Sequence, residues 1–504
     1  MEGSLQGLWK TLENKKYAFL RRAREASALT LPFVIPPQSS SGATDLATPF
    51  QSDGARAVNN LAAKLLLSQF PPNSPFFKLV LDSSTAQELA GVGEEASDEV
   101  RKSLIAIVDS VHHEIETSGF RPVAAETFRN LVISGNALFE WQPDQEPRMF
   151  SLESYCCIRD GSGNIELVLI QEKLSKTTLP PEIQGLVKVE EGSEEVLLYT
   201  LYHRKPDGSW MTKQEAGQAE ISQGSLNAED LPVLALRMNR KQGESYGRGI
   251  VEEYLGDLRS LEALSQSLVH GAAASARLLG LVDPNGSTDV QRLNDTPNGG
   301  FTPGNAEDVT WLRVEKASDF SFVLQASMQI RENLARAFLL NTSIQRQAER
   351  VTAEEIRFLA QELSDTFGGT YATLAREFQS PLVKLLLRRL QEEQKIPPLP
   401  EGLVEPKIVT GIEALGRGQE LLRLRGFHAD AVAMLGQDQV GMYLDPRGAL
   451  TQLAVDYGLN TDGIVRDEEE IQALQQQAQM AALAQSPAAS TLVNQAGETA
   501  RNQL

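Results

Sequence analysis

Apolar residues recur at helical spacing in the first part of the chain. Leu5, Leu8 and Leu12 lie three or four residues apart and predict a helix over 5–29, which Pro32 keeps from continuing. The same spacing predicts a second helix from about Asp53 to Gln69, which Pro71 and Pro72 end. A helical pair rich in glutamate is expected over 85–118. A further helix over 123–135 then passes directly into a strand over 136–142.

The spacing changes to that of strands after about residue 148. Two pairs of apolar stretches flank turn residues, Gly161 to Asn164 in the first pair and Pro206 to Gly208 in the second, and both arrangements predict β-hairpins. Residues 233–240 predict another strand. Adjacent cysteines rarely satisfy disulfide geometry, so we expect Cys156 and Cys157 to be reduced strand residues, one on each face of a sheet.

The second half of the chain is predominantly helical. Long helices are predicted over 247–276 and 319–340, separated by a segment of about 40 residues rich in Gly, Pro and Asn. A structureless loop of that length is improbable inside a compact domain, so we expect a small β-containing unit that needs neighbours to bury its apolar residues. These residues are Phe301, Val309, Trp311, Leu312 and Val314. An ordinary helical domain with an insertion is the alternative.

Capping and breaking residues mark the helices that follow. Thr352 and Glu355 fit a capping box, so a helix is expected to begin there and to end at Gly368–Gly369. A last helix should run to about 394, bent at Pro381. A proline-rich linker over 395–402 precedes further helices, and the Gln- and Ala-rich tail is expected to be disordered.

The charge of the chain argues against tight binding to DNA. With 67 acidic and 47 basic residues, the formal net charge is −20, whereas proteins that grip phosphates present a basic surface. The same charge suits a surface past which DNA slides, because like charges repel. No apolar run reaches the roughly 18 residues that span a bilayer, and no secretory signal is evident. We therefore expect a soluble protein without membrane contact, made in a reducing cytoplasm.

Two motifs of common enzymes are missing from the sequence. It has no GxxxxGK[ST] phosphate loop and no HExxH zinc motif. Residues 91–96 match GxGxxG/A, but they follow a helical stretch and would point two glutamates at a pyrophosphate. Asp160, Ser162 and Asn164 resemble the start of a calcium loop that lacks its glycine at the sixth position. We predict no catalytic residues, no metal site and no cofactor.

Several long blocks of sequence carry a family resemblance. GESYGRGIVEEYLGDLRSLEALSQ (243–266) and the block over 349–391, which contains TAEEIRFLAQELSDTFGGTYATLAREFQSP, resemble the portal, or head-to-tail connector, proteins of short-tailed, podovirus-type bacteriophages. The blocks over 48–72, 133–141 and 405–421 are similar too, in the same order along the chain. The resemblance covers about residues 5–465, and each block is long enough to be specific.

This resemblance implies an α+β, predominantly helical fold, the phage portal fold, assembled as a ring. The expected regions are a wing (1–240), a stem helix (241–276), a clip (277–318), a second stem helix (319–340), a channel loop (341–351), wing return helices and a linker (352–402), and a crown with a flexible C-terminal tail (403–504). A homo-oligomer of about twelve subunits would carry a total charge of roughly −240, so its lumen should be mainly acidic.

The implied function is a channel at one capsid vertex of the virion through which double-stranded DNA is packaged and ejected. Candidates for facing the DNA are Arg346, Gln347 and Arg350, although Arg350 could equally pair with Glu354 or Glu355. Candidates for docking partners on the clip are Phe301, Trp311 and Arg313. The implied partners are the terminase ATPase, tail adaptor and tail proteins, major capsid and scaffolding proteins, and internal core proteins. The alternatives are another structural ring or tail-adaptor protein of the head–tail junction, or an enzyme whose site the motifs do not reveal.

Overall fold

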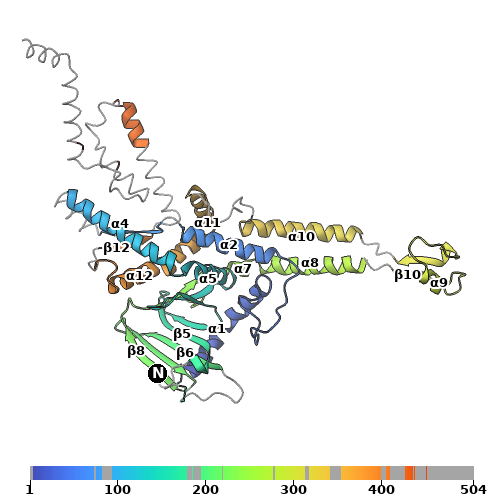
Figure 1. The fold of residues 1–504 in the computed structure, drawn as a ribbon, viewed down its shortest axis with the longest axis horizontal. Helices are drawn as coiled ribbons and strands as arrows, with labels where there is room; N and C mark the ends of the chain where they lie inside the picture. The colour runs from blue at the N-terminus through green and yellow to red at the C-terminus, as the bar shows by residue number, and fades with distance from the viewer. Residues whose placement is uncertain are drawn as a thin grey trace, which may run out of the picture. The chain divides into compact units, whose positions relative to one another are not determined.

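The computed structural model of the 504-residue chain divides by its internal contacts into two units, Met1–Ile412 and Glu413–Leu504. The structure describes residues 4–72, 75–81, 94–178, 184–185, 195–217, 219–275, 279–312, 317–340, 353–398, 404–408, 426–434, 436, 450 and 471. Every helix and strand labelled in Figure 1 belongs to the first unit. In the second unit, residues 426–434 are helical.

A five-stranded antiparallel sheet packs against the first helix, α1 (Leu5–Ala28). Its strands, in spatial order, are β4 (Tyr155–Arg159), β5 (Ile165–Ser175), β6 (Glu195–Arg204), β7 (Trp210–Ala216) and β8 (Ala219–Leu226). Both predicted hairpin turns are confirmed, with Gly163 and Gly208 at positive φ. Strand β8 was not predicted, because it lies at the edge of the sheet and its residues are mostly exposed and polar.

The two cysteines lie on opposite faces of this sheet, as predicted. Cys156 packs in an apolar cluster with Trp9 and Leu12 of α1, whereas Cys157 belongs to a separate cluster with Tyr202 and Trp210. Both thiols are free and buried. Each cysteine therefore supplies a small apolar side chain to a different apolar cluster.

A second layer contains the main core of the unit. Its sheet has the order β3–β2–β9, and its helices pack around an aromatic cluster in which Phe70 makes edge contacts with Phe76, Phe120 and Phe378 at centroid distances of 4.9, 4.9 and 5.1 Å. The elements are α2 (Asp53–Gln69), α4 (Glu94–Thr117), α5 (Phe120–Ser134), β2 (Asn136–Glu140), β3 (Arg148–Phe150) and β9 (Val233–Arg237). The predicted bounds of α2 and the predicted change from helix α5 to strand β2 are both confirmed.

Two of the sequence blocks that carry the family resemblance interlock in this layer. A Cβ on Gly135 would lie 2.1 Å from the carbonyl carbon of Arg248, and a Cβ on Gly249 would lie 2.2 Å from the carbonyl oxygen of Ile133. Asn136 closes the crossing, because its Nδ2 donates to Gly247 O (2.9 Å) and its Oδ1 accepts from Gly247 N (2.7 Å). Only glycine permits such a close backbone crossing, which explains why both blocks contain it.

The chain next forms a helical hairpin that carries a small tip. Its elements are α7 (Ile250–Glu253), α8 (Leu255–Ser275), β10 (Leu279–Val282), α9 (Val290–Asp295), β11 (Val309–Leu312) and α10 (Ala317–Ala337). The single helix predicted over 247–276 is interrupted at Tyr254, whose φ of −109° and ψ of 15° separate α7 from α8. The ring of Tyr254 packs against Phe338 at 5.3 Å, so tertiary packing determines the break.

The last helices of the unit differ from the prediction at two places. Gly368–Gly369 does not end α11 (Ala353–Leu374), which kinks at Phe367 and continues, because the turns that follow bury Tyr371 and Leu374 in the main core. The bend expected at Pro381 is replaced by a π-helical turn, Ala375–Gln379, and Pro381 lies in the first turn of α12 (Ser380–Glu392), where a missing N–H is tolerated. Thr352 of the predicted capping box and the C-terminal tail beyond residue 471 lie outside the described residues.

Strand β12 (Val404–Ile408) pairs with a strand far away in sequence, β1 (Phe77–Leu81). The pairing is antiparallel, with Phe77 opposite Ile408. Residues that begin the predicted crown thus form a sheet with residues of the predicted wing. Neither strand was predicted, since each is short and its partner lies more than 300 residues away in the sequence.

A buried lysine joins α1 to the five-stranded sheet. The side chain of Lys16 is inaccessible to solvent, and its Nζ donates hydrogen bonds to the carbonyl oxygens of Leu152, Glu153 and Tyr155 at 2.8–2.9 Å. Burial lowers the pKa of Lys16. Burial also raises the pKa of the neighbouring Cys156 thiol to about 11, although the nearby lysine acts in the opposite direction.

We expect both thiols to be unreactive in the folded protein. With a pKa of about 11, roughly one Cys156 thiol in a thousand is ionised at pH 8, and access is blocked for both residues. Ellman's reagent at pH 8 should titrate almost no thiol in the native protein and two per chain in guanidinium chloride. Rapid reaction of one thiol per native chain would contradict this burial.

Candidate functional site

The long helices α8 and α10 pack side by side and form a hairpin (Figure 1). Gly271 of α8 makes the close approach possible, because a Cβ there would lie 2.3 Å from the ring of Phe320 on α10. Leu258 and Leu261 at one end of α8, and Leu334 at the end of α10, lie in the main core. The hairpin is thus rooted in the core at the end where α8 begins and α10 finishes.

Polar contacts fix the hairpin to the helices that precede it in the chain. The carboxylate of Glu262 on α8 accepts hydrogen bonds from the backbone N–H groups of Phe50 (2.9 Å) and Gln51 (3.3 Å). On α10, Arg331 pairs with Asp53 at the start of α2 at 3.0 Å. Each helix of the hairpin therefore has its own polar attachment to the segment that leads into α2.

The tip of the hairpin, residues 279–312, is held together mainly by polar contacts. Strands β10 and β11 form a two-stranded antiparallel pair. Beside them, the carboxylate of Asp308 accepts hydrogen bonds from Ser287 N (2.8 Å), Thr288 N (3.1 Å) and Thr288 Oγ1 (2.9 Å). These bonds lower the pKa of Asp308. An isolated strand pair is marginally stable in water, so the fold of the tip depends on the hydrogen bonds that the Asp308 carboxylate accepts.

Apolar side chains of the hairpin and tip face solvent. None of the described residues between 262 and 329 belongs to a buried apolar cluster. Seven large apolar side chains are exposed there: Val269, Leu281, Val290, Phe301, Phe322, Leu324 and Met328. Phe301 is 101% exposed and Phe322 is 73% exposed. So many large apolar side chains exposed on one hairpin favour a surface that another molecule covers.

The tip is also acidic. Residues 279–312 contain five acidic side chains and a single arginine, Arg292. The closest acidic partner of Arg292 is Asp289, at 3.8 Å. The tip thus combines exposed apolar side chains with a net negative charge.

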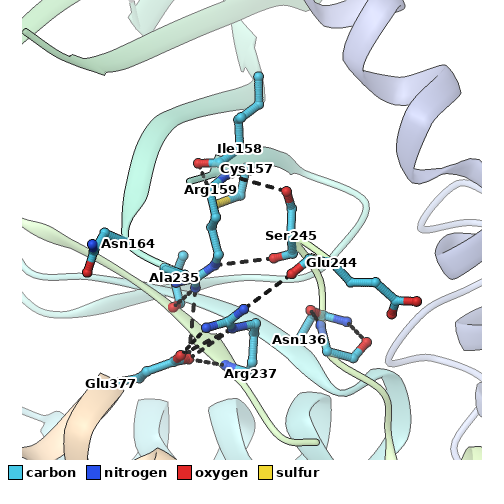
Figure 2. Close-up of polar contacts among 12 residues, drawn as sticks. Asn136, Cys157, Ile158, Arg159, Asn164, Ala235, Arg237, Glu244, Ser245 and Glu377 are labelled. Carbon is cyan, nitrogen blue, oxygen red and sulfur yellow. Dashed lines mark hydrogen bonds and ion pairs between the residues drawn. The ribbon is translucent and has the colours of Figure 1, made fainter. Parts of the chain in front are cut away.

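A second polar centre lies inside the unit, between the two sheets and the π-helical turn (Figure 2). Glu377 of that turn forms a salt bridge with Arg237 of β9 (2.5 Å between Oε1 and Nη2), and also accepts from the backbone N–H of Arg237 (3.1 Å). Arg159 of β4 lies 3.9 Å from the same carboxylate. The exposed fractions of the three side chains are only 12%, 4% and 5%.

Backbone carbonyls satisfy the remaining donors of these arginines. Arg159 donates to Ser245 O (3.2 Å), Gly163 O (2.8 Å) and Ala235 O (2.6 Å), as Figure 2 shows in part. Arg237 also donates to Glu244 O at 3.3 Å. One carboxylate therefore compensates two buried cations and joins the five-stranded sheet, the three-stranded sheet and the last helices.

The structure describes two of the six residues proposed from the sequence, at least in part. Phe301 lies at the tip with its side chain fully exposed, and Trp311 lies in β11, where its backbone pairs with Gly280. Arg313, Arg346, Gln347 and Arg350 lie outside the described residues. Glu377 and its two arginines were missed, because Glu377 lies 140 or more positions from either arginine and no local pattern connects them.

The described part of the chain contains no cluster of three or more His, Cys, Asp or Glu side chains able to hold a metal ion. Among the same residues, no helix has both the length and the apolar character that crossing a bilayer requires.

Comparison with known proteins identifies the family. The family model described as bacteriophage head to tail connecting protein matches residues 2–465. The chain belongs to this family. It is 36% identical to the portal protein of Enterobacteria phage T3, over 94% of this chain and 90% of that protein. It is also 36% identical to the portal protein of Escherichia phage T7, over 97% of this chain and 94% of that protein.

Among solved structures, the chain is similar to one in the neck of a native GTA particle computed with C12 symmetry. The TM-score is 0.37 and the identity is 11%, over 81% of this chain and 90% of the other.

Replacing the shared carboxylate should strongly destabilise the unit. Glu377→Gln leaves two buried guanidinium groups without their compensating charge, a change that typically costs about 3–5 kcal/mol. The midpoint of guanidinium-induced unfolding should fall accordingly. As a control, Glu229→Gln removes an exposed partner of Arg388 and should change the free energy of unfolding by less than about 0.5 kcal/mol. Equal effects of the two substitutions would contradict the role assigned to Glu377.

Proposed function

We propose that the protein is the subunit of a ring-shaped portal channel at one capsid vertex, through which double-stranded DNA is packaged and later ejected. Membership of the head-to-tail connector family supports this role, as does similarity over almost the whole length of proteins named portal proteins. That length of similarity favours a portal over a smaller tail adaptor. The proposed location is the head–tail junction of the virion, and the proposed role is structural rather than enzymatic.

The exposed apolar hairpin is the observation that carries the proposal of a ring. Burying a large apolar side chain contributes about 1.5–3 kcal/mol, and seven such side chains are exposed on the hairpin and tip. Neighbouring copies of the same hairpin, related by cyclic symmetry, would cover this surface in every subunit at once. A homo-oligomer of about twelve subunits is the proposed assembly.

The regions predicted from the sequence supply the proposed architecture. Helices α8 and α10 form the stem, the tip forms the clip, and the layers around the two sheets form the wing. The segment over 341–351 is the proposed channel loop, whose Arg346, Gln347 and Arg350 would form rings facing the DNA. With a charge of −20 on each subunit, the rest of the lumen would repel the phosphates and let DNA slide.

The proposed partners meet the ring at different places. The terminase ATPase would dock on the clip during packaging and tail proteins would dock there afterwards, with Phe301, Trp311 and Arg313 as contact candidates. The fully exposed ring of Phe301 supports this assignment, since it belongs to none of the apolar clusters of the described residues. Capsid, scaffolding and internal core proteins would contact other parts of the ring.

Serine substitutions on α10 test the contribution of the exposed apolar side chains to the ring. Phe322→Ser combined with Met328→Ser should weaken association by about a hundredfold or more at each interface while the subunit stays folded, because both side chains are exposed. Gln325→Ser is the matched control, because it removes exposed polar surface from the same helix. Analytical ultracentrifugation measures the assembly, and circular dichroism checks the fold. Unchanged rings in the double variant would contradict the proposed interface.

A further inference from the structure

Helix α2 contacts both of the helices that border residues 338–352. It lies beside the end of α10 and beside α11, and residues 338–352 connect those two helices in the chain. The two helices also meet near their C-terminal ends, where Tyr371 Oη of α11 donates to the carbonyl oxygen of Ser68 of α2 at 2.9 Å. Helix α2 is therefore a common support for the two helix ends.

One side chain of α2 reaches both helices. Lys64 is only 5% exposed, and its Nζ donates to the carbonyl oxygen of Leu339 at 2.7 Å, directly after the end of α10. The same Nζ lies 3.6 Å from Oε2 of Glu362 on α11. A single buried ammonium group thus stabilises the negative end of one helix and a carboxylate on the next.

The end of α10 has an additional support that does not involve α11. Asn60 Nδ2 donates to the carbonyl oxygens of Phe338 (3.0 Å) and Leu339 (3.1 Å). Leu339 has a φ of +54°, in the left-handed region that residues other than glycine seldom adopt. Donors from α2 therefore satisfy the carbonyls at a backbone turn that is costly to form.

We propose that Lys64 is a positioning residue that ties the end of α10 to α11 and so fixes these two helices relative to each other. The link rests on the contacts of Lys64 with Leu339 O and with the Glu362 carboxylate. Its consequence rests on the proposed function, in which Arg346, Gln347 and Arg350, which lie between these two helices in the sequence, face DNA. A methionine at position 64 would fill similar space but would leave Leu339 O and the Glu362 carboxylate without their shared cation.

Hydrogen exchange of the full-length protein, followed by mass spectrometry, tests the link. One readout is the exchange of the amides of Phe338, Leu339 and Leu340, which donate to Leu334, Arg336 and Ala335. The other is the exchange of amides in α11 from Leu363 to Leu374. Lys64→Met should speed exchange about tenfold or more in both segments, since a lost bond to a charged group raises the population of locally open states.

A variant that removes a contact to only one of the two helices should speed exchange in only one segment. Asn60→Ala should speed exchange at 338–340 alone, and Glu362→Ala should speed it in α11 alone. Lys64→Arg keeps the cation and should preserve protection in both. Lys16→Met is the matched control: it also replaces a buried lysine bonded to backbone carbonyls, but in α1, and should leave both segments unchanged.

The pattern of exchange decides between a link and a simple helix cap. An effect of Lys64→Met confined to 338–340, or an equal effect of Lys16→Met, would overturn the proposal. If Lys64→Met does not fold, Lys64→Arg and Glu362→Ala carry the test. Loss of protection in both segments of Lys64→Arg would also overturn the proposal. So would unchanged protection in both segments of Glu362→Ala. A protein that forms no rings would contradict the proposed function, while the exchange pattern would still report on the link.

Discussion

The arrangement of the first unit depends on one buried carboxylate that two arginines share. Glu377 reaches from the π-helical turn to Arg237 of β9 and Arg159 of β4. The two sheets and the last helices, which are distant in sequence, therefore meet at this carboxylate. The π-helical turn contains both this carboxylate and Phe378, which packs in the aromatic cluster around Phe70. Because charge pairing and core packing are fixed by the same turn, α12 and the end of α11 are held against both sheets.

The hairpin obeys a different constraint. Only its root is part of the main core, and the remainder relies on Gly271, on contacts between its two helices and on the hydrogen bonds of Asp308. In water, its exposed apolar side chains favour association, and cyclic symmetry offers a way to bury them in every copy. In the proposed ring, folding of the tip and assembly would be linked, since an isolated strand pair is marginally stable and a neighbour would supply the missing apolar contacts.

Much of the secondary structure could be predicted from the sequence, because it depends on local signals. Spacing and prolines gave the bounds of α2, and turn residues gave both hairpins of the five-stranded sheet. The errors have tertiary causes: the core holds α11 together across Gly368–Gly369, and Tyr254 breaks a helix where the spacing continues. Phe301 was proposed as a contact residue because it is an apolar residue of the Gly-, Pro- and Asn-rich segment that the resemblance identifies as the clip. In contrast, Glu377 and Lys64 act through partners distant in sequence, so no spacing could reveal them.

Native mass spectrometry of the purified protein, combined with negative-stain images, tests the central claim most directly. We expect closed rings of about twelve subunits with a central hole, stable at micromolar concentration across a range of salt concentrations. A stable monomer or dimer under all these conditions, with its hairpin surface still exposed, would contradict it.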